Sequence, residues 1–328
     1  MKHFDLNFKI ADLTRFYNKV IMDDGLPYLT VDEAAFEKQF LTPVKEGDAV
    51  FALDTADGTG FISGCFAGNI KRFFLTMIVV DPSKRRQGIG TLLLQGLEDK
   101  MRSFAEEQGL SFSELEVSYF NPINLTWILP DTDGHRHPNS PGVRLGSSAH
   151  LFLKNRGFRD FSYQNSYDLT MQEYEWPQEK LQPYIEKMDQ KGLSITFYDA
   201  QQHTGMDDLV KDLNNDLWNY QIPEEMNRPG GPRPMLIVDD HGKVGGFAGP
   251  VVPGEDGRGF FLGIAIHSVC RGAGAATVLF NRLCLEFKKA GAEYMTLFTA
   301  EDNPARSIYE SAGFKIRASW ADMRRRIR

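Results

Sequence analysis

Residues 85–90 of the chain read Arg-Arg-Gln-Gly-Ile-Gly, and residues 271–276 read Arg-Gly-Ala-Gly-Ala-Ala. Both stretches fit the pattern R-x-x-G-x-[G/A], both follow an apolar β-like run, and both open a long amphipathic helix. Such a turn aims backbone N–H groups and the positive end of a helix at one point in space, which suits a pyrophosphate. The sequence therefore predicts a duplicated α/β unit with a phosphate-binding loop in each copy.

The elements around the two loops follow the same order in both halves of the chain. Each half predicts a hairpin, an apolar strand before the loop, and a further strand after the helix, at residues 49–68, 73–80 and 115–120 in the first half and 235–251, 260–266 and 295–299 in the second. Residues 173–192 are polar and contain Pro177, which indicates a helical connector. We therefore expect an α/β chain of two domains, 1–172 and 193–328, joined by the connector 173–192.

The amino-acid composition limits which class of protein this chain can belong to and which partners it can bind. The 328 residues are 42% hydrophobic and 25% charged, as in a soluble globular protein, and the net charge is −7. An acidic chain is a poor partner for nucleic acid, and no stretch has the roughly 18 apolar residues that a membrane span needs. Three scattered cysteines indicate neither a disulfide framework nor a zinc cluster. We expect a cytoplasmic protein without nucleic-acid or membrane partners.

The second half carries the more specific signature. Its loop follows Leu-Gly-Ile-Ala-Ile-His-Ser-Val at residues 262–269, and residues 303–314 read Asn-Pro-Ala-Arg-Ser-Ile-Tyr-Glu-Ser-Ala-Gly-Phe. This combination resembles the GNAT superfamily of acetyl-CoA-dependent N-acyltransferases, and the duplicated chain resembles its tandem type. The resemblance covers nearly all of the second half and, with one interruption, the first. It implies two domains, each with a strongly bent, mostly antiparallel sheet flanked by helices.

The resemblance also implies acetyl-CoA as co-substrate. Its pantetheine arm would lie where the sheet splays open, between the strand before the loop and the strand after the helix, and its pyrophosphate would lie on the loop. The residues implied to bind acetyl-CoA are Ile264, Ala265, Ile266, Arg271, Gly272, Ala273, Gly274, Ala275, Ala276 and Asn303 in the second half, and Arg85, Arg86, Gln87, Gly88, Ile89 and Gly90 in the first. Asn121 corresponds to Asn303.

The halves differ at the position of the general acid. The resemblance implies Tyr309 as the acid that protonates the departing thiolate. Alignment of Gly313 with Gly157 places Leu153 at that position in the first half, and leucine cannot donate a proton. The base that accepts a proton from the amine stays open, because no spacing selects among the candidates His267, Glu255, Asp256 and Glu301.

An insertion interrupts the family pattern in the first half. Asn121 and Gly157 are 36 positions apart, whereas Asn303 and Gly313 are 10 apart, and the extra residues lie at about 122–146. A Pro/Gly-rich segment of this length is uncommon without a function, such as covering the active site, contacting the other domain or binding substrate. Its His135-x-His137, with Asp131 and Asp133, matches no well-defined ligand spacing, so we expect no metal.

We therefore expect a tandem GNAT acetyltransferase that acts on a primary amine of a small molecule, with a catalytic C-terminal domain and a structural or regulatory N-terminal domain. Two alternatives stay open. One is a non-catalytic protein that senses acyl-CoA or binds a partner, and the other is catalysis in the N-terminal domain with His135 or His137 as acid or base. A monomer and a homodimer are both compatible with the sequence.

Overall fold

The boundary between the two halves of the chain falls inside a strand. The computed structural model describes residues 1–327, apart from the side chains of residues 216 and 217. Unit 1 consists of Met1–Ser166 together with Arg317–Arg328, and unit 2 is Tyr167–Ile316. These units differ from the expected domains, 1–172 and 193–328, because the last strand of the chain completes the sheet of unit 1 and because the expected connector packs within unit 2.

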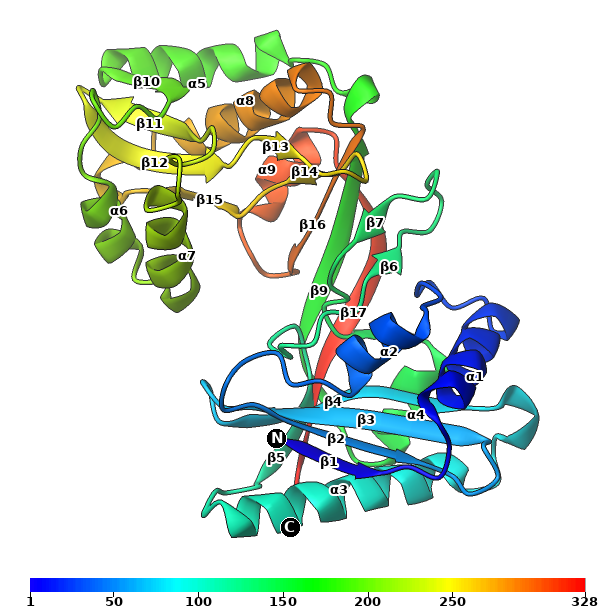
Figure 1. The fold of residues 1–328 in the computed structure, drawn as a ribbon. Helices are drawn as coiled ribbons and strands as arrows, with labels where there is room; N and C mark the ends of the chain where they lie inside the picture. Colours follow the sequence, from blue (N-terminus) through cyan, green and yellow to red (C-terminus); the bar gives the residue numbers. More distant parts are fainter. Residues whose placement is uncertain (328) are drawn as a thin grey trace. The chain divides into compact units, whose positions relative to one another are not determined.

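The sheet of unit 1 takes its strands from both ends of the chain (Figure 1). Their order is β1-β2-β3-β4-β5-β17-β9, in which β17 is the C-terminal strand. Two neighbouring pairs, β1 with β2 and β4 with β5, are parallel. The strand bounds are Lys2–Asp5 (β1), Ala49–Asp54 (β2), Gly60–Ala67 (β3), Arg72–Val80 (β4), Glu114–Val117 (β5), Arg159–Thr170 (β9) and Lys315–Arg326 (β17).

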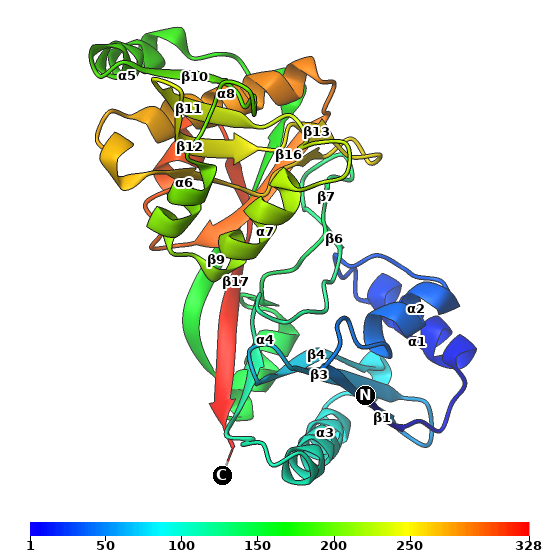
Figure 2. The ribbon, with the colours of Figure 1, turned by 60° about the vertical axis from the view of Figure 1, so that its left-hand side comes forward.

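Helices cover both faces of this sheet, which is why its central strands are apolar in nearly every position. The helices α1 (Ile10–Asp23) and α2 (Glu33–Phe40) share one core cluster with one face, and α3 (Ile89–Glu107) and α4 (Ser148–Asn155) share another with the opposite face (Figure 2). Close packing against α3 explains Gly60, because a Cβ there would lie 2.8 Å from the side chain of Leu93.

The insertion folds into short strands within unit 1. Residues Trp127–Ile128 (β6) and Arg136–His137 (β7) form a hairpin, and Val143–Arg144 (β8) pairs with β17. Trp127 packs edge-on against Trp320 of β17, with ring centroids 4.7 Å apart, and both side chains are fully buried. The insertion is therefore part of the unit 1 core.

Unit 2 repeats the pattern with fewer strands. Its sheet has the order β10-β11-β12-β15, and β16 lies beside β9 in the other sheet. The single strand expected over 260–266 is two strands, because β14 pairs with β13 whereas β15 pairs with β12. The strand bounds are Leu193–Phe197 (β10), Leu236–Asp240 (β11), Lys243–Gly249 (β12), Val252–Pro253 (β13), Gly259–Phe260 (β14), Gly263–Ile266 (β15) and Tyr294–Ala300 (β16).

The helices of unit 2 include the segment that the sequence predicts as a connector. This segment is α5, which packs on α8 and on β10. The helix bounds are Gln178–Gln190 (α5), Met206–Leu213 (α6), Asp216–Met226 (α7), Ala275–Lys289 (α8) and Arg306–Ser311 (α9). Within the described residues, none of the helices combines the length and the apolar character that crossing a bilayer requires.

Candidate active site

The two glycine-rich loops have the same backbone conformation. The second and fourth residues of each signature lie in the left-handed region, with φ of 63° at Arg86 and 87° at Gly88 in unit 1, and 82° at Gly272 and 78° at Gly274 in unit 2. In the part of the chain that the structure describes, the N–H groups of residues 86–90 and 272–276 donate no main-chain hydrogen bond. Each loop therefore has five amides without a main-chain acceptor at the positive end of a helix, an arrangement that suits phosphate where the loop is open.

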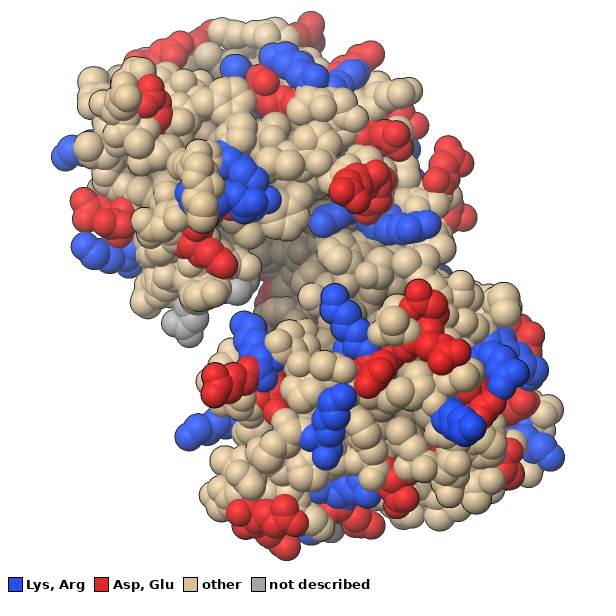
Figure 3. Space-filling view, in the orientation of Figure 1, with Lys and Arg blue, Asp and Glu red and all other residues tan. Residues whose placement is uncertain are grey.

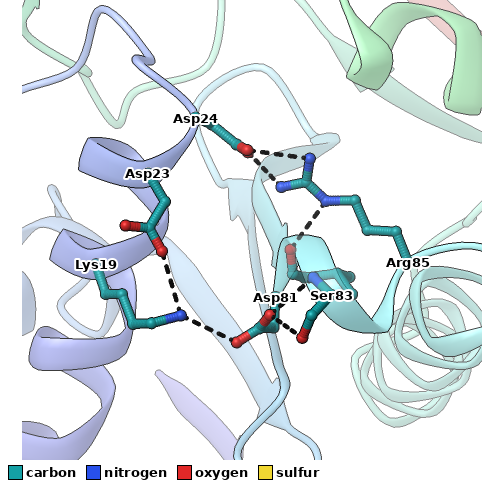
Figure 4. A network of polar contacts seen from close by, with 7 residues as sticks. Lys19, Asp23, Asp24, Asp81, Ser83 and Arg85 are labelled. Carbon is teal, nitrogen blue, oxygen red and sulfur yellow. Dashed lines mark hydrogen bonds and ion pairs between the residues drawn. The ribbon is translucent and has the colours of Figure 1, made fainter.

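The first arginine of each signature holds its loop to the preceding strand. Arg85 Nε donates to the Val80 carbonyl oxygen at 3.1 Å, and Arg271 Nε donates to the Ile266 carbonyl oxygen at 3.1 Å. The guanidinium of Arg85 also pairs with the carboxylate of Asp24, at the end of α1 (Figure 4). The structure thus gives the expected phosphate ligand Arg85 an anchoring contact.

Further polar contacts fix the start of the unit 1 loop (Figure 4). Asp81 accepts hydrogen bonds from the Ser83 backbone N–H at 2.9 Å and from the Ser83 hydroxyl at 2.7 Å, and it pairs with Lys19 at 3.2 Å. The Ser83 hydrogen bonds, with a contribution from Lys19, lower the pKa of Asp81 to about 2. Asp81 is therefore a constant anion that caps the turn before the loop.

The equivalent turn of unit 2 uses a histidine. His267 Nδ1 accepts from the Val269 backbone N–H at 3.3 Å, and Asp212 accepts from the backbone N–H and the hydroxyl of Ser268 at 2.8 and 2.6 Å. His267 was one of four candidate bases, and its ring nitrogen is used here as a cap. Another candidate, Asp256, contacts the hydroxyl of Tyr294 at 3.3 Å.

The loops differ in what surrounds them, a difference that the sequence does not predict. Among the described residues, nothing lies within 4 Å of the position that a Cβ on Gly88 would take. The same position on Gly274 meets the side chain of Tyr184 from α5, with Cγ at 2.7 Å and Cβ at 2.9 Å. Lys191, just after α5, also reaches the Arg271 carbonyl oxygen at 3.4 Å. The unit 1 loop is open, and the unit 2 loop is covered at Gly274.

The two strands that were expected to border the pantetheine arm are paired little or not at all in each unit. In unit 1, β4 and β5 pair only at Phe73–Leu115 and Phe74–Glu116, after which the strands separate. In unit 2, β15 and β16 belong to different sheets. The neighbourhood of β15 is filled, because the Trp218 ring lies about 3 Å from the Cβ position of Gly263. The expected pantetheine contacts Ala265 and Ile266 are buried, and Ile264 is half-buried.

Asn121 and Asn303, which correspond to each other in the two units, make similar but not identical hydrogen bonds. Asn303 Nδ2 donates to Thr299 Oγ1 of β16, the strand just before it, at 2.8 Å. Asn121 Nδ2 donates to Thr76 Oγ1 of β4 at 3.1 Å, so this side chain crosses from the segment after β5 to β4. Thr76 marks a register shift in the pairing of β3 with β4, a β-bulge of the kind often found beside active sites.

Tyr309, the expected acid, lies in the core of unit 2. It is 7% exposed, and its ring packs against Phe280 and Tyr167 with centroids 4.9 and 6.2 Å away. Burial raises the pKa of Tyr309 to about 12. At the corresponding position of unit 1, Leu153 is a buried residue of α4. The role of Tyr309 as an acid therefore stays a prediction.

Sequence reasoning missed Asp322 of β17, an acid that is fully buried. Its side chain is fully buried in unit 1 and accepts a hydrogen bond from Gln164 Nε2 at 2.9 Å. The signal was present in the run Trp-Ala-Asp-Met at 320–323, where a single acid interrupts the apolar middle of the strand. By contrast, no group of three or more His, Cys, Asp or Glu side chains within residues 1–327 is arranged to hold a metal ion.

The sequence profile of the Acetyltransferase (GNAT) family matches residues 15–124 and 194–314. A search of curated protein sequences gave no match. Similar solved structures include a GCN5-related N-acetyltransferase from Sphaerobacter thermophilus, with a TM-score of 0.58 and 14% identity over 100% of this chain and 96% of that one.

Two further structures share the fold. A tandem GNAT protein from the clavulanic acid biosynthesis pathway has a TM-score of 0.55 and 14% identity, covering 96% of this chain and 94% of that one. A glucosamine N-acetyltransferase region of a fungal multi-domain β-N-acetylglucosaminidase has a TM-score of 0.65 and 14% identity over 97% of this chain. This chain spans only 37% of that fungal protein. At such identities the likeness shows the fold alone.

The family match in both halves and the fold of the structural relatives confirm the expected mixed α/β architecture with two GNAT domains. The two matched regions each contain one copy of the duplicated signature, in the loop before α3 in unit 1 and in the loop before α8 in unit 2. The chain is therefore a tandem member of the acetyltransferase (GNAT) family.

Proposed function

We propose that the protein is an acetyl-CoA-dependent N-acetyltransferase that binds its donor at residues 86–90 of unit 1 and transfers the acetyl group to a primary amine of a small molecule. One observation carries the assignment to unit 1: Gly88 faces open space, whereas Gly274 is covered by Tyr184. A pyrophosphate needs close approach to the backbone, and glycine permits that approach only where nothing else fills the space.

The residues of unit 1 suit each part of the donor. The free amides of residues 86–90 would bind the pyrophosphate, with Arg85 and Asp24 holding the loop in place. The separation of β4 from β5 after Phe74 would admit the pantetheine arm. Backbone N–H groups at the Thr76 bulge would polarise the thioester carbonyl, which is the usual way a tetrahedral intermediate is stabilised.

A small acceptor is supported by the mixed charge of one face of the molecule. Among the described residues on the face shown in Figure 3, Lys and Arg side chains are interspersed with Asp and Glu side chains. This face therefore carries no extended field of one sign that would attract a large charged partner to it. Glucosamine is the first amine to assay, since one protein of the same fold is described as a glucosamine N-acetyltransferase region.

The second candidate places catalysis in unit 2. It is favoured by Tyr309, since unit 1 has Leu153 at the equivalent position. The two assignments predict different consequences for the same pair of variants, and one experiment separates them.

The test compares Gly88→Glu with Gly272→Glu by calorimetric titration of the full chain with acetyl-CoA. Gly272 is the second residue of its signature and Gly88 the fourth, but both are left-handed, with φ of 82° and 87°, and both face open space, so a glutamate side chain fits at either. We expect one site per chain, abolished by Gly88→Glu and retained in Gly272→Glu. Loss of acetyl-CoA binding only in Gly272→Glu would assign the donor site to unit 2. Absence of binding by the unmodified protein would refute the proposal.

Activity is measured in parallel as release of free thiol with a panel of amines: glucosamine, spermidine, an amino acid amide and an aminoglycoside. We expect thiol release that depends on one of these amines and is lost in Gly88→Glu. Binding of acetyl-CoA without amine-dependent thiol release would favour the non-catalytic, acyl-CoA-sensing alternative.

A further inference from the structure

Arg258 of unit 2 is a cation that forms no ion pair among the described residues. It is half-buried and comes directly before β14, in the hairpin that β13 and β14 form (Figure 1). Within residues 1–327 its guanidinium also donates no hydrogen bond, and its Cζ lies 6.0 Å from the centroid of the Phe260 ring. The guanidinium nitrogens all reach solvent. A half-buried cation with unused donors at the surface is costly unless an anion binds to it.

The equivalent arginine of unit 1 does have an acidic partner. Arg72 and Arg258 are 186 positions apart, and so are Arg85 and Arg271, the first residues of the two glycine-rich signatures. Each of the earlier pair lies at or just before the first residue of a strand, β4 or β14, that precedes its loop. Arg72 pairs with Glu116 of β5 at 3.7 Å. The two units therefore share this cation and differ in its partner.

The absence of a partner in unit 2 can be traced to one position. In unit 1, Glu116 lies two residues beyond the position on β5 that faces Arg72. In unit 2, Arg258 forms a parallel bridge with Tyr294 of β16, and the residue two beyond Tyr294 is Thr296. A threonine carries no charge that could neutralise a guanidinium. Unit 2 has therefore kept the arginine without the acid.

The charged groups around Arg258 are already engaged or do not compensate its charge. Arg233 lies 5.3 Å from the centroid of the same ring, and its Nε donates to both carboxylate oxygens of Glu225 at 2.9 and 3.0 Å. Asp256 accepts from the Arg258 backbone N–H at 3.2 Å and from the Tyr294 hydroxyl at 3.3 Å. Burial outweighs the charges of Asp256 and Tyr294 and lowers the pKa of Arg258.

These surroundings define the anion that fits. A guanidinium offers two parallel N–H donors, which match a carboxylate or a phosphate group. A carboxylate balances the single unmatched charge, whereas a phosphate ester carries about −1.5 to −2 at pH 7 and would need a second free cation. Arg233 does not supply that cation, because Glu225 already binds it. The half-buried ring of Phe260 suits an apolar body on the same molecule.

We propose that unit 2 binds a small molecule that has a carboxylate beside an apolar body. Arg258 binds the carboxylate, and the ring of Phe260 contacts the apolar part. The site lies at β14, ahead of β15, whereas the glycine-rich loop that Tyr184 covers follows β15, so the two places are distinct. The inference depends neither on acetyl transfer nor on which unit holds acetyl-CoA.

The experiment titrates the full chain with phenylacetate, which has one carboxylate on an aromatic body, and measures its Kd by ligand-observed NMR. We expect the unmodified protein to bind it, and we expect the Kd to be weaker by about tenfold or more in Arg258→Gln, which removes the charge and the parallel donors. The matched control is Arg72→Gln, with an unchanged Kd, since Arg72 already pairs with Glu116. An unchanged Kd in Arg258→Gln, or no binding by the unmodified protein, would overturn the inference.

Two further probes test the chemistry of the ligand. Phenylacetamide has the same ring without the charge, so its Kd should be weaker than that of phenylacetate by about tenfold or more. Phenyl phosphate has a ring with a more highly charged group. Tighter binding of phenyl phosphate than of phenylacetate would overturn the assignment to a carboxylate.

A second variant separates loss of the charge from damage to the hairpin. Arg258→Lys keeps the positive charge and loses the parallel donors, so its Kd should lie between those of the unmodified protein and Arg258→Gln. A Kd as weak as that of Arg258→Gln would show that the charge is not what binds, and it would overturn the inference. The Tm of Arg258→Gln should not fall below that of the unmodified protein, because the substitution removes an uncompensated charge.

Discussion

The side chain of Tyr184 packs against Gly274, the residue that immediately precedes α8. Tyr184 belongs to α5, the helix that precedes β10, the first strand of the unit 2 sheet. Two loops of the same backbone conformation thus lie in different surroundings, because α5 packs beside the loop of unit 2. The difference between the halves lies in what covers the loop and not in the loop itself.

Removal of this cover should restore a second donor site. In Tyr184→Ala we expect the calorimetric stoichiometry to rise from one acetyl-CoA per chain to two, because the amides of residues 272–276 become accessible. Tyr220→Ala is the control, since Tyr220 is a tyrosine of the same unit that is 64% exposed. A stoichiometry of one in Tyr184→Ala would mean that something other than Tyr184 closes this loop.

Tyr309→Phe tests which unit is catalytic. Its ring contacts with Phe280 and Tyr167 do not involve the hydroxyl, so phenylalanine should preserve the packing. With catalysis in unit 1 we expect kcat to change by less than about twofold. A tyrosine that acted as general acid would instead lower kcat by roughly one to three orders of magnitude when replaced. A fall of that size, measured by thiol release, would assign the chemistry to unit 2.

Asp24→Asn distinguishes an anchoring arginine from a phosphate ligand. If Arg85 holds the loop, loss of the Asp24 carboxylate should weaken acetyl-CoA binding about fivefold, equivalent to roughly 1 kcal/mol. If Arg85 binds phosphate directly, freeing its guanidinium should tighten binding. The matched control is Asp23→Asn, because the adjacent Asp23 pairs with Lys19 at 3.2 Å and not with Arg85. Calorimetric titration measures the Kd of acetyl-CoA for both variants.

Asp322→Asn should stabilise the protein, and only above a certain pH. The carboxyl of an unfolded chain titrates near 3.8, and burial raises the pKa of Asp322 in the fold to about 6. Below pH 3.8 the carboxyl is protonated in both the folded and the unfolded state, so it does not change the free energy of unfolding. Between the two values the unfolded state ionises first, so stability falls as the pH rises, and above 6 the full loss of about 3 kcal/mol is present.

Urea unfolding of both proteins at pH 4 and pH 8 measures this effect. We expect the free energy of unfolding of Asp322→Asn to exceed that of the unmodified protein at pH 8 and to equal it at pH 4. Asp160→Asn is a control of opposite sign. Burial raises the pKa of Asp160, but hydrogen bonds from Lys154 and His150 outweigh it and lower the pKa, so this variant should be destabilised at pH 8. Equal stabilities of Asp322→Asn and the unmodified protein at pH 8 would contradict the raised pKa.

Local patterns in the sequence were sufficient to predict much of the fold. The apolar run before each loop became β4 and β15, and the helices after them follow the glycine signatures. These features depend on residues close together in the chain, where turn geometry and periodicity decide the outcome. The left-handed backbone conformation of Arg86 was harder to predict, because the equivalent position is a glycine, Gly272, only in the second half.

Long-range relationships could not be predicted in the same way. The alternation of residues 315–326 indicates a strand but not its partner, so pairing of Met323 with Val117 could not be derived. The cover at Gly274 depends on where a polar helix packs, and Tyr184 has no sequence signal that points to a loop 90 positions away. Asp322 was missed for the same reason, since its burial depends on β5, β9 and the insertion together.

The route of the chain through β17 has a consequence for biosynthesis. Residues 1–166 leave the ribosome before any of Tyr167–Ile316, and the residues of β17 that pair with β5, 323–326, are made last. At about 5–20 residues per second, the nascent first domain waits roughly 8 to 30 seconds with one edge of its sheet unpaired. An unpaired edge is a template for aggregation. Translation speed through the second half should therefore influence the yield of active protein.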